Sequence, residues 1–299
     1  MGPNAKVFTT DLHPEMSSAC LTSDKGFKVG RFADPDYMDV ILEICKQHEI
    51  GLIIPTIDTE LKLLAQSRSR FEKEGIHCIV SDEAFIDVCR DKRNMNQFFE
   101  EHGFLIPQSI DIDDPSFPVF IKPYNGSSSK DIFLVKDASM LASYMKDKER
   151  FMHLEYLSPK DYKEYTIDLY YNRTGQLKCI VPRVRIAVRG GETNKGITQK
   201  HKFIMSFVQE KLQHIEGARG CLTLQIFHGL TNDKIYGIEI NPRFGGGYPL
   251  SYLAKANYPA WIIEEYLLGR EITDFEDWED NLLLLRHDNE MLVHGFEYK

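Results

Sequence analysis

The chain has 299 residues, of which 42% are hydrophobic and 27% charged, a composition typical of a soluble globular protein with room for more than one domain. Its 36 Lys and Arg against 45 Asp and Glu give a net charge of −9, so no overall positive field attracts a nucleic-acid backbone. The longest apolar runs, 50–54 and 282–285, are far shorter than the roughly 20 residues of a membrane span.

The N-terminus and the cysteines indicate a cellular compartment. Residues 1–6 lack the apolar core of a secretory signal. The six cysteines are scattered, with no CxxC pair among them. We therefore expect a cytoplasmic protein with reduced thiols, bound to neither nucleic acid nor membrane.

The first third of the chain alternates short apolar strands with amphipathic helices. The pattern predicts strands at 6–10, 51–55 and 76–80 and helices at 40–48, 60–75 and 82–89, with Ser81 capping the last helix. Such alternation predicts a parallel, Rossmann-like α/β sheet. The first strand lies almost at the start of the chain, without an earlier strand and glycine-rich turn. An incomplete N-terminal sheet is therefore one of the alternatives.

A helix at 91–102 and an acidic, proline-flanked connector at 107–118 precede a different pattern. Beyond the connector the chain is rich in β-runs with few helices, at 117–122, 151–156, 164–171, 177–188, 221–228 and 234–241. This part is expected to be α+β with antiparallel sheet. We place one domain at residues 1–90 and a second at 91–299, with a small lobe near 115–157 and a large lobe near 158–299.

The segment GIEINPRFGGG at 237–247 is the most informative in the chain. Glu239 and Asn241 are two apart on a strand and so project from the same face. A hairpin turning through 231–233 would set Gln225 beside Glu239 on that face. One carboxylate and two amide oxygens, with room for water and phosphate, suit Mg²⁺. A solvated strand face is the alternative, and the Asn-Pro-Arg and triple glycine argue against it.

Cationic and small residues complete a phosphate-binding pattern. Arg243 would neutralise a transferring phosphoryl group, and the glycines at 245–247 permit close backbone approach to a ligand. Lys122 ends a strand, and after it comes a small polar loop able to surround phosphates, which includes Gly126, Ser127, Ser128 and Ser129. The P-loop pattern GxxxxGK[ST] is absent. Taken alone, a strand-end lysine with its head in water and a flexible hairpin loop explain this segment equally well.

Three further strands carry charges. Residues 153–159 lead from a strand into a turn, and Glu164 and Asp168 lie at the two ends of the next strand. For these carboxylates a solvent-facing position is the simplest interpretation. Arg183 and Arg185 share one face of the strand at 177–188 and could bind a carboxylate substrate or an acylphosphate. A solvated edge strand with alternating charges would look the same, so both interpretations stay open.

Together the segments at 120–130, 153–159, 163–168 and 237–247 resemble the ATP-grasp superfamily, and more closely the branch of carbamoyl-phosphate synthase large subunits and related carboxylate ligases. The resemblance implies a preATP-grasp domain followed by an ATP-grasp fold of two lobes with the nucleotide between them. It also implies that ATP phosphorylates a carboxylate to an acylphosphate, which an amine or ammonia then attacks.

The resemblance also implies roles for single residues. Nucleotide phosphates would be bound by Lys92 and Lys122 and covered by the loop Gly126–Ser129. The adenine would lie at a hinge formed by Glu155, Tyr156 and Leu157, and the ribose at Glu164. Two Mg²⁺ ions, replaceable by Mn²⁺, would be held by Gln225, Glu239 and Asn241, with Glu239 bridging them. The catalytic cations would be Arg243 and Lys122, with Arg183 and Arg185 as substrate contacts.

These patterns predict a Mg²⁺-dependent ligase that joins a small carboxylate, with amino acids among the candidates, to an amine. The chain is several times shorter than a carbamoyl-phosphate synthase large subunit, so we do not expect it to make carbamoyl phosphate in that way. A silent nucleotide-binding sensor or subunit is the alternative, and a dinucleotide-dependent oxidoreductase is disfavoured because GxGxxG is absent. A homodimer is the default assembly. The sequence names neither the carboxylate nor the amine.

Overall fold

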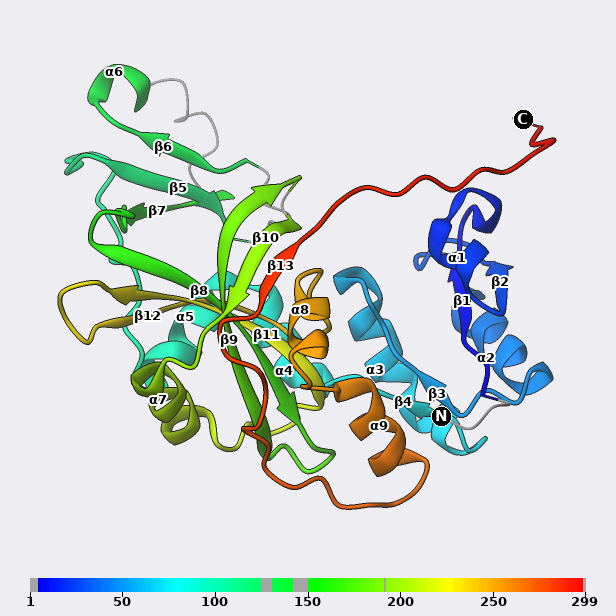
Figure 1. Cartoon of the computed structure of the whole chain (residues 1–299). Helices are drawn as coiled ribbons and strands as arrows, with labels where there is room; N and C mark the ends of the chain where they lie inside the picture. Colours follow the sequence, from blue (N-terminus) through cyan, green and yellow to red (C-terminus); the bar gives the residue numbers. More distant parts are fainter. Residues whose placement is uncertain (1–4, 125–130, 142–149, 191, 298–299) are drawn as a thin grey trace.

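The computed structural model describes residues 5–124, 131–141, 150–190 and 192–297. These residues form an N-terminal α/β unit, a small three-stranded sheet and a large six-stranded sheet (Figure 1). An N-terminal α/β unit followed by two α+β lobes is the predicted fold class. No helix in the described ranges is both long enough and apolar enough to cross a membrane.

The N-terminal unit contains two parallel strand pairs and their helices. Its elements are β1 (Phe8–Asp11), η1 (Pro14–Met16), α1 (Ser18–Thr22), β2 (Lys25–Lys28), α2 (Tyr37–Gln47), β3 (Leu52–Ile53), α3 (Asp58–Glu72), β4 (His77–Cys78) and α4 (Glu83–Arg90). The predicted parallel pairing is confirmed, since β1 pairs with β2 and β3 with β4. Within the described residues the two pairs form separate sheets, because β3 and β4 pair over only two residues each.

Helical spacing of apolar residues explains the core of this unit. On α3, Leu61, Leu64 and Phe71 recur on one face and are buried against α2 and Ile86 of α4. The expected cap of α4 was wrong: Asp82, not Ser81, is the N-cap residue. The Ser81 hydroxyl is fully buried and accepts a hydrogen bond from the backbone N–H of Arg219 in the large lobe (3.2 Å).

The small lobe is an antiparallel sheet in the order β6-β5-β7, reached through helix α5. Its elements are α5 (Lys92–Glu101), β5 (Val119–Pro123), β6 (Phe133–Val135), α6 (Ala138–Leu141) and β7 (Phe151–Glu155). Val119, Ile121 and Val135 form its buried core. The chain begins α5 with a cap, since the Asp91 carboxylate accepts from the backbone N–H of Arg93 (2.9 Å).

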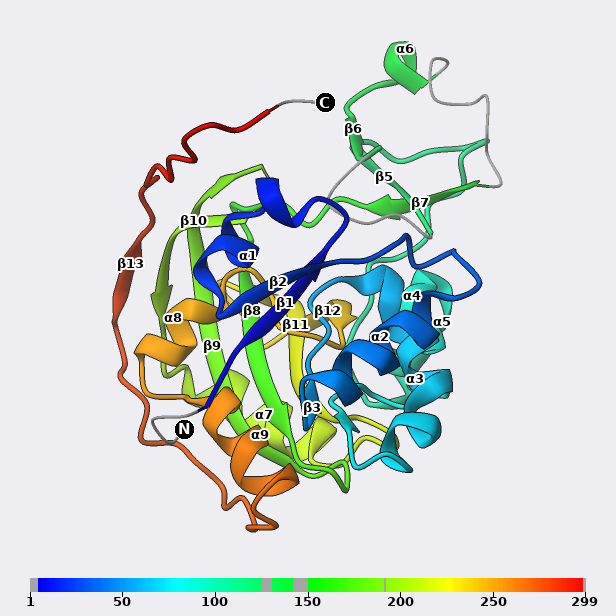
Figure 2. The ribbon, with the colours of Figure 1, turned by 90° about the vertical axis from the view of Figure 1, so that its right-hand side faces the viewer.

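The large lobe is an antiparallel sheet in the order β12-β11-β8-β9-β10-β13. Its elements are β8 (Tyr162–Tyr171), β9 (Leu177–Arg189), β10 (Glu192–Thr198), α7 (Lys202–Leu212), β11 (Gly220–Gly229), β12 (Ile235–Asn241), α8 (Tyr248–Leu253), α9 (Tyr258–Tyr266) and β13 (Leu283–Leu285). Figure 2 shows β13 at the outer edge of this sheet, and Figure 1 shows that the segment after β13 leaves the sheet.

Alternation along the strands separates two cores. Ile167 and Leu169 of β8 face α7, whereas Tyr170 faces α8 and α9. Ile79 of the N-terminal unit joins the second core, so that unit packs directly on the large lobe. Because β9 lies between β8 and β10, the interpretation of its arginines as part of an edge strand is wrong.

Candidate functional site

A cavity of about 440 Å³ opens between the small sheet, the large sheet and the N-terminal helices. We call it the cleft. Every predicted site residue within the described ranges lines it: Lys92, Lys122, Glu155, Tyr156, Leu157, Glu164, Arg183, Arg185, Gln225, Glu239, Asn241 and Arg243. The predicted phosphate loop Gly126, Ser127, Ser128 and Ser129 lies outside the described residues.

The predicted metal ligands lie side by side on β11 and β12. Gln225 is the direct cross-strand partner of Glu239, as the hairpin argument requires. Glu239 Oε1 accepts hydrogen bonds from Gln225 Nε2 (2.7 Å) and Asn241 Nδ2 (2.9 Å). Both amides then keep a carbonyl oxygen, and the carboxylate keeps Oε2, for other ligands. This hard-oxygen set fits Mg²⁺ when nucleotide phosphates supply further oxygens.

No three His, Cys, Asp or Glu side chains of the described residues are grouped as metal ligands. The set at Glu239 depends instead on amide oxygens, which Mg²⁺ and Mn²⁺ accept alongside carboxylates.

Two lysines place positive charge opposite Glu239. Lys122 is only 5% exposed, so the interpretation of it as a lysine with its head in water is wrong. Burial and the neighbouring charge of Lys92 lower the pKa of Lys122 to about 8, while Glu239 opposes the shift. Burial also lowers the pKa of Lys92. The Lys92 backbone N–H donates to the carbonyl of Tyr124 (3.0 Å), which ties the start of α5 to the end of β5. Two desolvated cations beside one carboxylate favour a bound anion.

The hinge between the lobes is fixed by the connector. The Glu155 backbone N–H donates to the carbonyl of Gln108 (2.8 Å), and the Gln108 N–H donates to Glu155 Oε1 (3.0 Å). The Glu155 carboxylate therefore holds the connector against β7. Beyond it, Tyr156 stacks with Phe120 at a ring-centroid distance of 6.5 Å.

The arginines of β9 are paired with carboxylates of β8. Arg185 Nη2 forms an ion pair with Glu164 Oε1, and both side chains are partly exposed. Arg183 is 1% exposed and binds Asp168 with two hydrogen bonds, Nε to Oδ2 (2.6 Å) and Nη2 to Oδ1 (2.8 Å). Asp168 is fully buried, which corrects its expected solvent-facing position.

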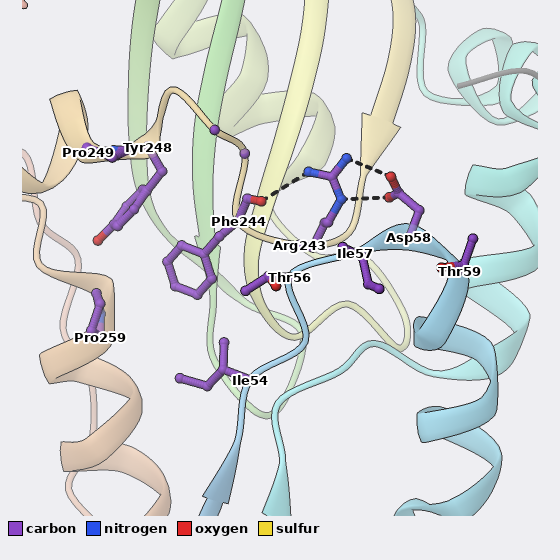
Figure 3. Close-up of a pocket in the computed structure, with 12 residues that line it drawn as sticks. Ile54, Thr56, Ile57, Asp58, Thr59, Arg243, Phe244, Tyr248, Pro249 and Pro259 are labelled. Atoms are coloured by element: carbon purple, nitrogen blue, oxygen red, sulfur yellow. Dashed lines mark hydrogen bonds and ion pairs between the residues drawn. The ribbon is translucent and has the colours of Figure 1, made fainter. Parts of the chain in front are cut away.

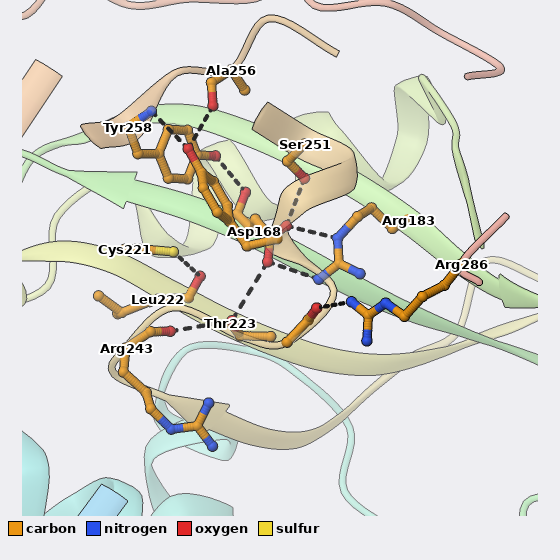
Figure 4. Close-up of polar contacts among 12 residues, drawn as sticks. Asp168, Arg183, Cys221, Leu222, Thr223, Arg243, Ser251, Ala256, Tyr258 and Arg286 are labelled. Carbon is orange, nitrogen blue, oxygen red and sulfur yellow. Dashed lines mark hydrogen bonds and ion pairs between the residues drawn. The ribbon is translucent and has the colours of Figure 1, made fainter. Parts of the chain in front are cut away.

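Figure 4 shows the Asp168–Arg183 pair together with Thr223 and Ser251, which also bind Asp168. Asp168 Oδ2 also accepts from the hydroxyl of Ser251 in α8 (2.6 Å). A Cβ at Gly247 would clash with Arg183 Nη1, and Asp168 holds that guanidinium in place, which favours glycine at this position. Arg286 Nη2 binds the same turn through the carbonyl of Gly246 (2.6 Å). Arg183 thus shapes the cleft wall in addition to lining it.

Arg243 is held by a residue that the sequence analysis missed. Its Nε and Nη2 donate to Asp58 Oδ1 (2.8 Å) and Oδ2 (2.6 Å), and its Nη1 donates to the carbonyl of Phe244 (3.0 Å) (Figure 3). Asp58 is the first residue of α3, where an acidic residue reads as ordinary helix stabilisation. Nothing in the local sequence of Asp58 connects it with Arg243, 185 residues away.

Comparisons with known proteins agree with this architecture. Residues 2–79 match the family model described as PylC-like, N-terminal domain. Residues 147–287, which include Gln225, Glu239, Asn241 and Arg243, match the model described as ATP-grasp in the biosynthetic pathway with Ter operon. Residues 147–287 are therefore similar to an ATP-grasp domain.

A curated relative supports the resemblance of this chain to the carbamoyl-phosphate synthase branch. The carbamoyl phosphate synthase large chain of Acidobacterium capsulatum is 22% identical over 241 residues, an alignment that covers 69% of this chain. The same alignment covers 21% of the relative, so the chain spans about a fifth of that protein.

Solved structures confirm the fold. The biotin carboxylase domain of Hydrogenobacter thermophilus 2-oxoglutarate carboxylase matches with a TM-score of 0.70 at 14% identity, over 93% of this chain and 68% of that one. An L-amino acid ligase from Bacillus licheniformis matches at 0.59 and 16% identity, over 82% and 63% of the two chains. N5-carboxyaminoimidazole synthetase from Staphylococcus aureus matches at 0.60 and 17%, over 83% and 66%.

Proposed function

We propose that this protein is an ATP-grasp ligase that joins a small-molecule carboxylate to an amine or ammonia, with release of ADP and phosphate. The observation that carries the proposal is the convergence of two desolvated lysines and an oxygen-rich strand face in one cleft. Lys92 and Lys122 come from α5 and β5, and Gln225, Glu239 and Asn241 from β11 and β12. Their arrangement supports binding of a nucleotide polyphosphate between the lobes.

In this proposal, Gln225, Glu239 and Asn241 hold one or two Mg²⁺ ions, with Mn²⁺ as a substitute. When bound, the metal neutralises phosphate charge. Lys92 and Lys122 bind the phosphates, the hinge at 155–157 contacts the adenine and Glu164 the ribose. Arg243 is placed to stabilise the transferred phosphoryl group.

The proposed reaction has two steps. A carboxylate oxygen attacks the γ-phosphorus, the bond from that phosphorus to the bridging oxygen breaks, and ADP leaves with the electron pair. The amine nitrogen then attacks the acyl carbon, the C–O bond to phosphate breaks, and inorganic phosphate and a proton are released. The protein's residues position the reactants and neutralise charge, which is the main requirement of phosphoryl transfer.

The test is release of ADP and phosphate from Mg-ATP with pooled carboxylates and amines. We expect release to require both pools, and Glu239→Gln to reduce it by about two to three orders of magnitude because the cleft loses its only carboxylate among the predicted metal ligands. Glu216→Gln, an exposed glutamate far from the cleft, is the matched control. Mass spectrometry of the active pool identifies the product.

Two outcomes would contradict the proposal. Unchanged turnover in Glu239→Gln would contradict the assignment of Glu239 as a metal ligand. Tight ATP binding without release in any pool would favour the nucleotide-binding sensor or subunit instead.

Three parts of the proposal concern the whole chain. We place the domain boundary near residue 90, between α4 and α5, and the lobe boundary near residue 157, just after β7. A homodimer is the proposed assembly, which light scattering of the purified protein tests. The free state of all six cysteines supports the cytoplasmic location that we propose.

A further inference from the structure

A second cavity, of about 720 Å³, adjoins the cleft (Figure 3). We call it the side cavity. It lies between the loop after β3 and the turn that links β12 to α8. The two cavities share five lining residues: Asp58, Thr59, Arg243, Gly245 and Gly246. A ligand in the side cavity would therefore meet the nucleotide cleft at Arg243, the residue proposed to bind the transferred phosphoryl group.

The walls of the side cavity are mainly apolar. Ile54 and Ile57 line one side, and Phe244, Tyr248 and Pro259 the other. Ile54 is 37% exposed and Ile57 is 53% exposed, so solvent covers much of their apolar surface. The rings of Phe244 and Tyr248 form an edge-to-face pair with centroids 4.7 Å apart. Such walls favour a ligand with an apolar body, because binding removes apolar surface from water on both partners.

The charges in the side cavity balance. Asp58 and Arg243 are the charged residues among the described residues that line it, and they bind each other through the two hydrogen bonds given above. A ligand with a single charge would pair with one of them and leave the other unpaired in a partly buried site. A ligand with both charges would replace one ion pair by two and leave the net charge of the cavity unchanged.

From this charge balance and these walls we propose that the side cavity binds a zwitterionic α-amino acid with an apolar side chain. Its ammonium group binds Asp58, its carboxylate binds Arg243, and its side chain packs between Ile54, Ile57 and Phe244. Asp58 is then the residue that selects for the amino group.

The inference rests on the proposed function and gives the amino acid a definite place in it. Its carboxylate, at the boundary with the cleft, is the group that receives the γ-phosphoryl. Its ammonium group, paired with Asp58, keeps its proton and so lacks the lone pair of a nucleophile. The nitrogen that displaces phosphate from the acyl carbon comes from a second molecule.

The test is calorimetric binding of three probes to the whole protein with Mg²⁺ and a non-hydrolysable ATP analogue. The probes are L-leucine, 4-methylpentanoate, which lacks the ammonium group, and 3-methylbutylamine, which lacks the carboxylate. We expect L-leucine to bind at least about tenfold more tightly than either analogue, because only it pairs both charges. Asp58→Asn should weaken the binding of L-leucine by about tenfold or more. It should not weaken the binding of 4-methylpentanoate, because this ligand no longer displaces a carboxylate from Arg243.

Asp87→Asn is the matched control, since Asp87 pairs with Lys62 (2.8 Å) and lines neither cavity. It should leave all three probe affinities unchanged. An unchanged thermal midpoint and an unchanged Kd for the ATP analogue in Asp58→Asn would show that this variant keeps its fold and its cleft.

Two binding results would overturn the inference alone. These are equal affinity of L-leucine and 4-methylpentanoate for the unmodified protein, and an unchanged Kd for L-leucine in Asp58→Asn while the ATP analogue still binds. ADP release that occurs only with carboxylates lacking an amino group would also contradict the amino-acid substrate, while the proposed ligase activity would stand. Failure of the unmodified protein to bind the ATP analogue would remove the proposed function, and this inference with it.

Discussion

Lys122 combines burial with the repulsion of a second lysine, a costly arrangement for a cation without an anionic ligand. Its side chain is 5% exposed, and the charge of Lys92 adds to the burial that lowers its pKa. Glu239 offsets part of the cost. A phosphate bound beside Lys122 would add negative charge there, so this buried lysine would be stabilised by a bound nucleotide.

The lowered pKa of Lys122 predicts pH-dependent nucleotide binding. Below about pH 8 the lysine is charged and attracts phosphate, and above it the free protein loses that charge. We therefore expect the Kd for Mg-ATP to rise between pH 7 and pH 9, with a limiting slope of about tenfold per pH unit. Titration at several pH values measures it.

Lys122→Gln is the comparison for this titration. It should bind Mg-ATP more weakly at pH 7 and show a shallower pH dependence, with the lowered pKa of Lys92 as the remaining source. An equally steep dependence in the variant would show that Lys122 is not the titrating group.

At the scale of elements, strands β8 and β9 are joined by two ion pairs of contrasting burial. Asp168 and Arg183 are at most 1% exposed, whereas Glu164 and Arg185 remain partly open to solvent. The first pair also receives the Ser251 hydroxyl from α8, so it links two strands and a helix beneath the turn 245–247. Loss of one partner is costly for the buried Asp168–Arg183 pair, because it leaves a buried charge unpaired. The partly exposed Glu164–Arg185 pair contributes little to stability.

Replacing each of the two arginines by methionine should therefore lower the free energy of unfolding by different amounts. Arg183→Met leaves the buried Asp168 carboxylate without its partner and should lower the free energy of unfolding by about 3–5 kcal/mol. Arg185→Met removes a partly exposed pair and should lower it by about 1 kcal/mol or less. Urea denaturation measures both. Equal losses would contradict the assignment of Arg183 as the support of this part of the sheet.

At the scale of the whole molecule, two ion-pair contacts among the described residues join the N-terminal unit to the large lobe, in addition to the packing of Ile79. Asp58 binds Arg243 beside the cleft. Away from the cleft, Asp82 forms ion pairs with Arg68 and Arg219, and its backbone N–H donates to the carbonyl of Gly217 (2.8 Å). The second attachment holds the unit in position without touching either cavity.

Loss of the Asp82 side chain should loosen this attachment. In Asp82→Ala, we expect faster amide hydrogen exchange in α3 and α4 and a higher KM with little change in kcat, because the wall that carries Asp58 is less well positioned. Asp39→Ala removes an ion pair with Arg70 inside the N-terminal unit and is the matched control. Similar exchange in the two variants would contradict a docking role for Asp82.

The sequence predicted most strands of the chain and helices α2 to α5, because their apolar periodicity is strong, whereas α1 and α6 to α9 had no predicted range. Its misses have particular causes. Strands β2 and β13 have short patterns, and β10 is a polar run whose place in the sheet is set by Arg183 and Val184 across from it. The cap of α4 was assigned to Ser81 because serine is a frequent cap, whereas the tertiary contact with Arg219 uses that hydroxyl.

By itself the sequence determined the order of most strands and one shared strand face, since Glu239 and Asn241 project from the same side of a strand and Gln225 joins them through one hairpin. Only the tertiary structure decided which charges are buried and which are paired. Burial depends on elements far apart in the chain, as in Asp168 with Ser251 and Asp58 with Arg243. Local patterns are fixed by neighbours along the chain, whereas a pocket is formed where distant segments meet, and so the side cavity has no signature in the sequence.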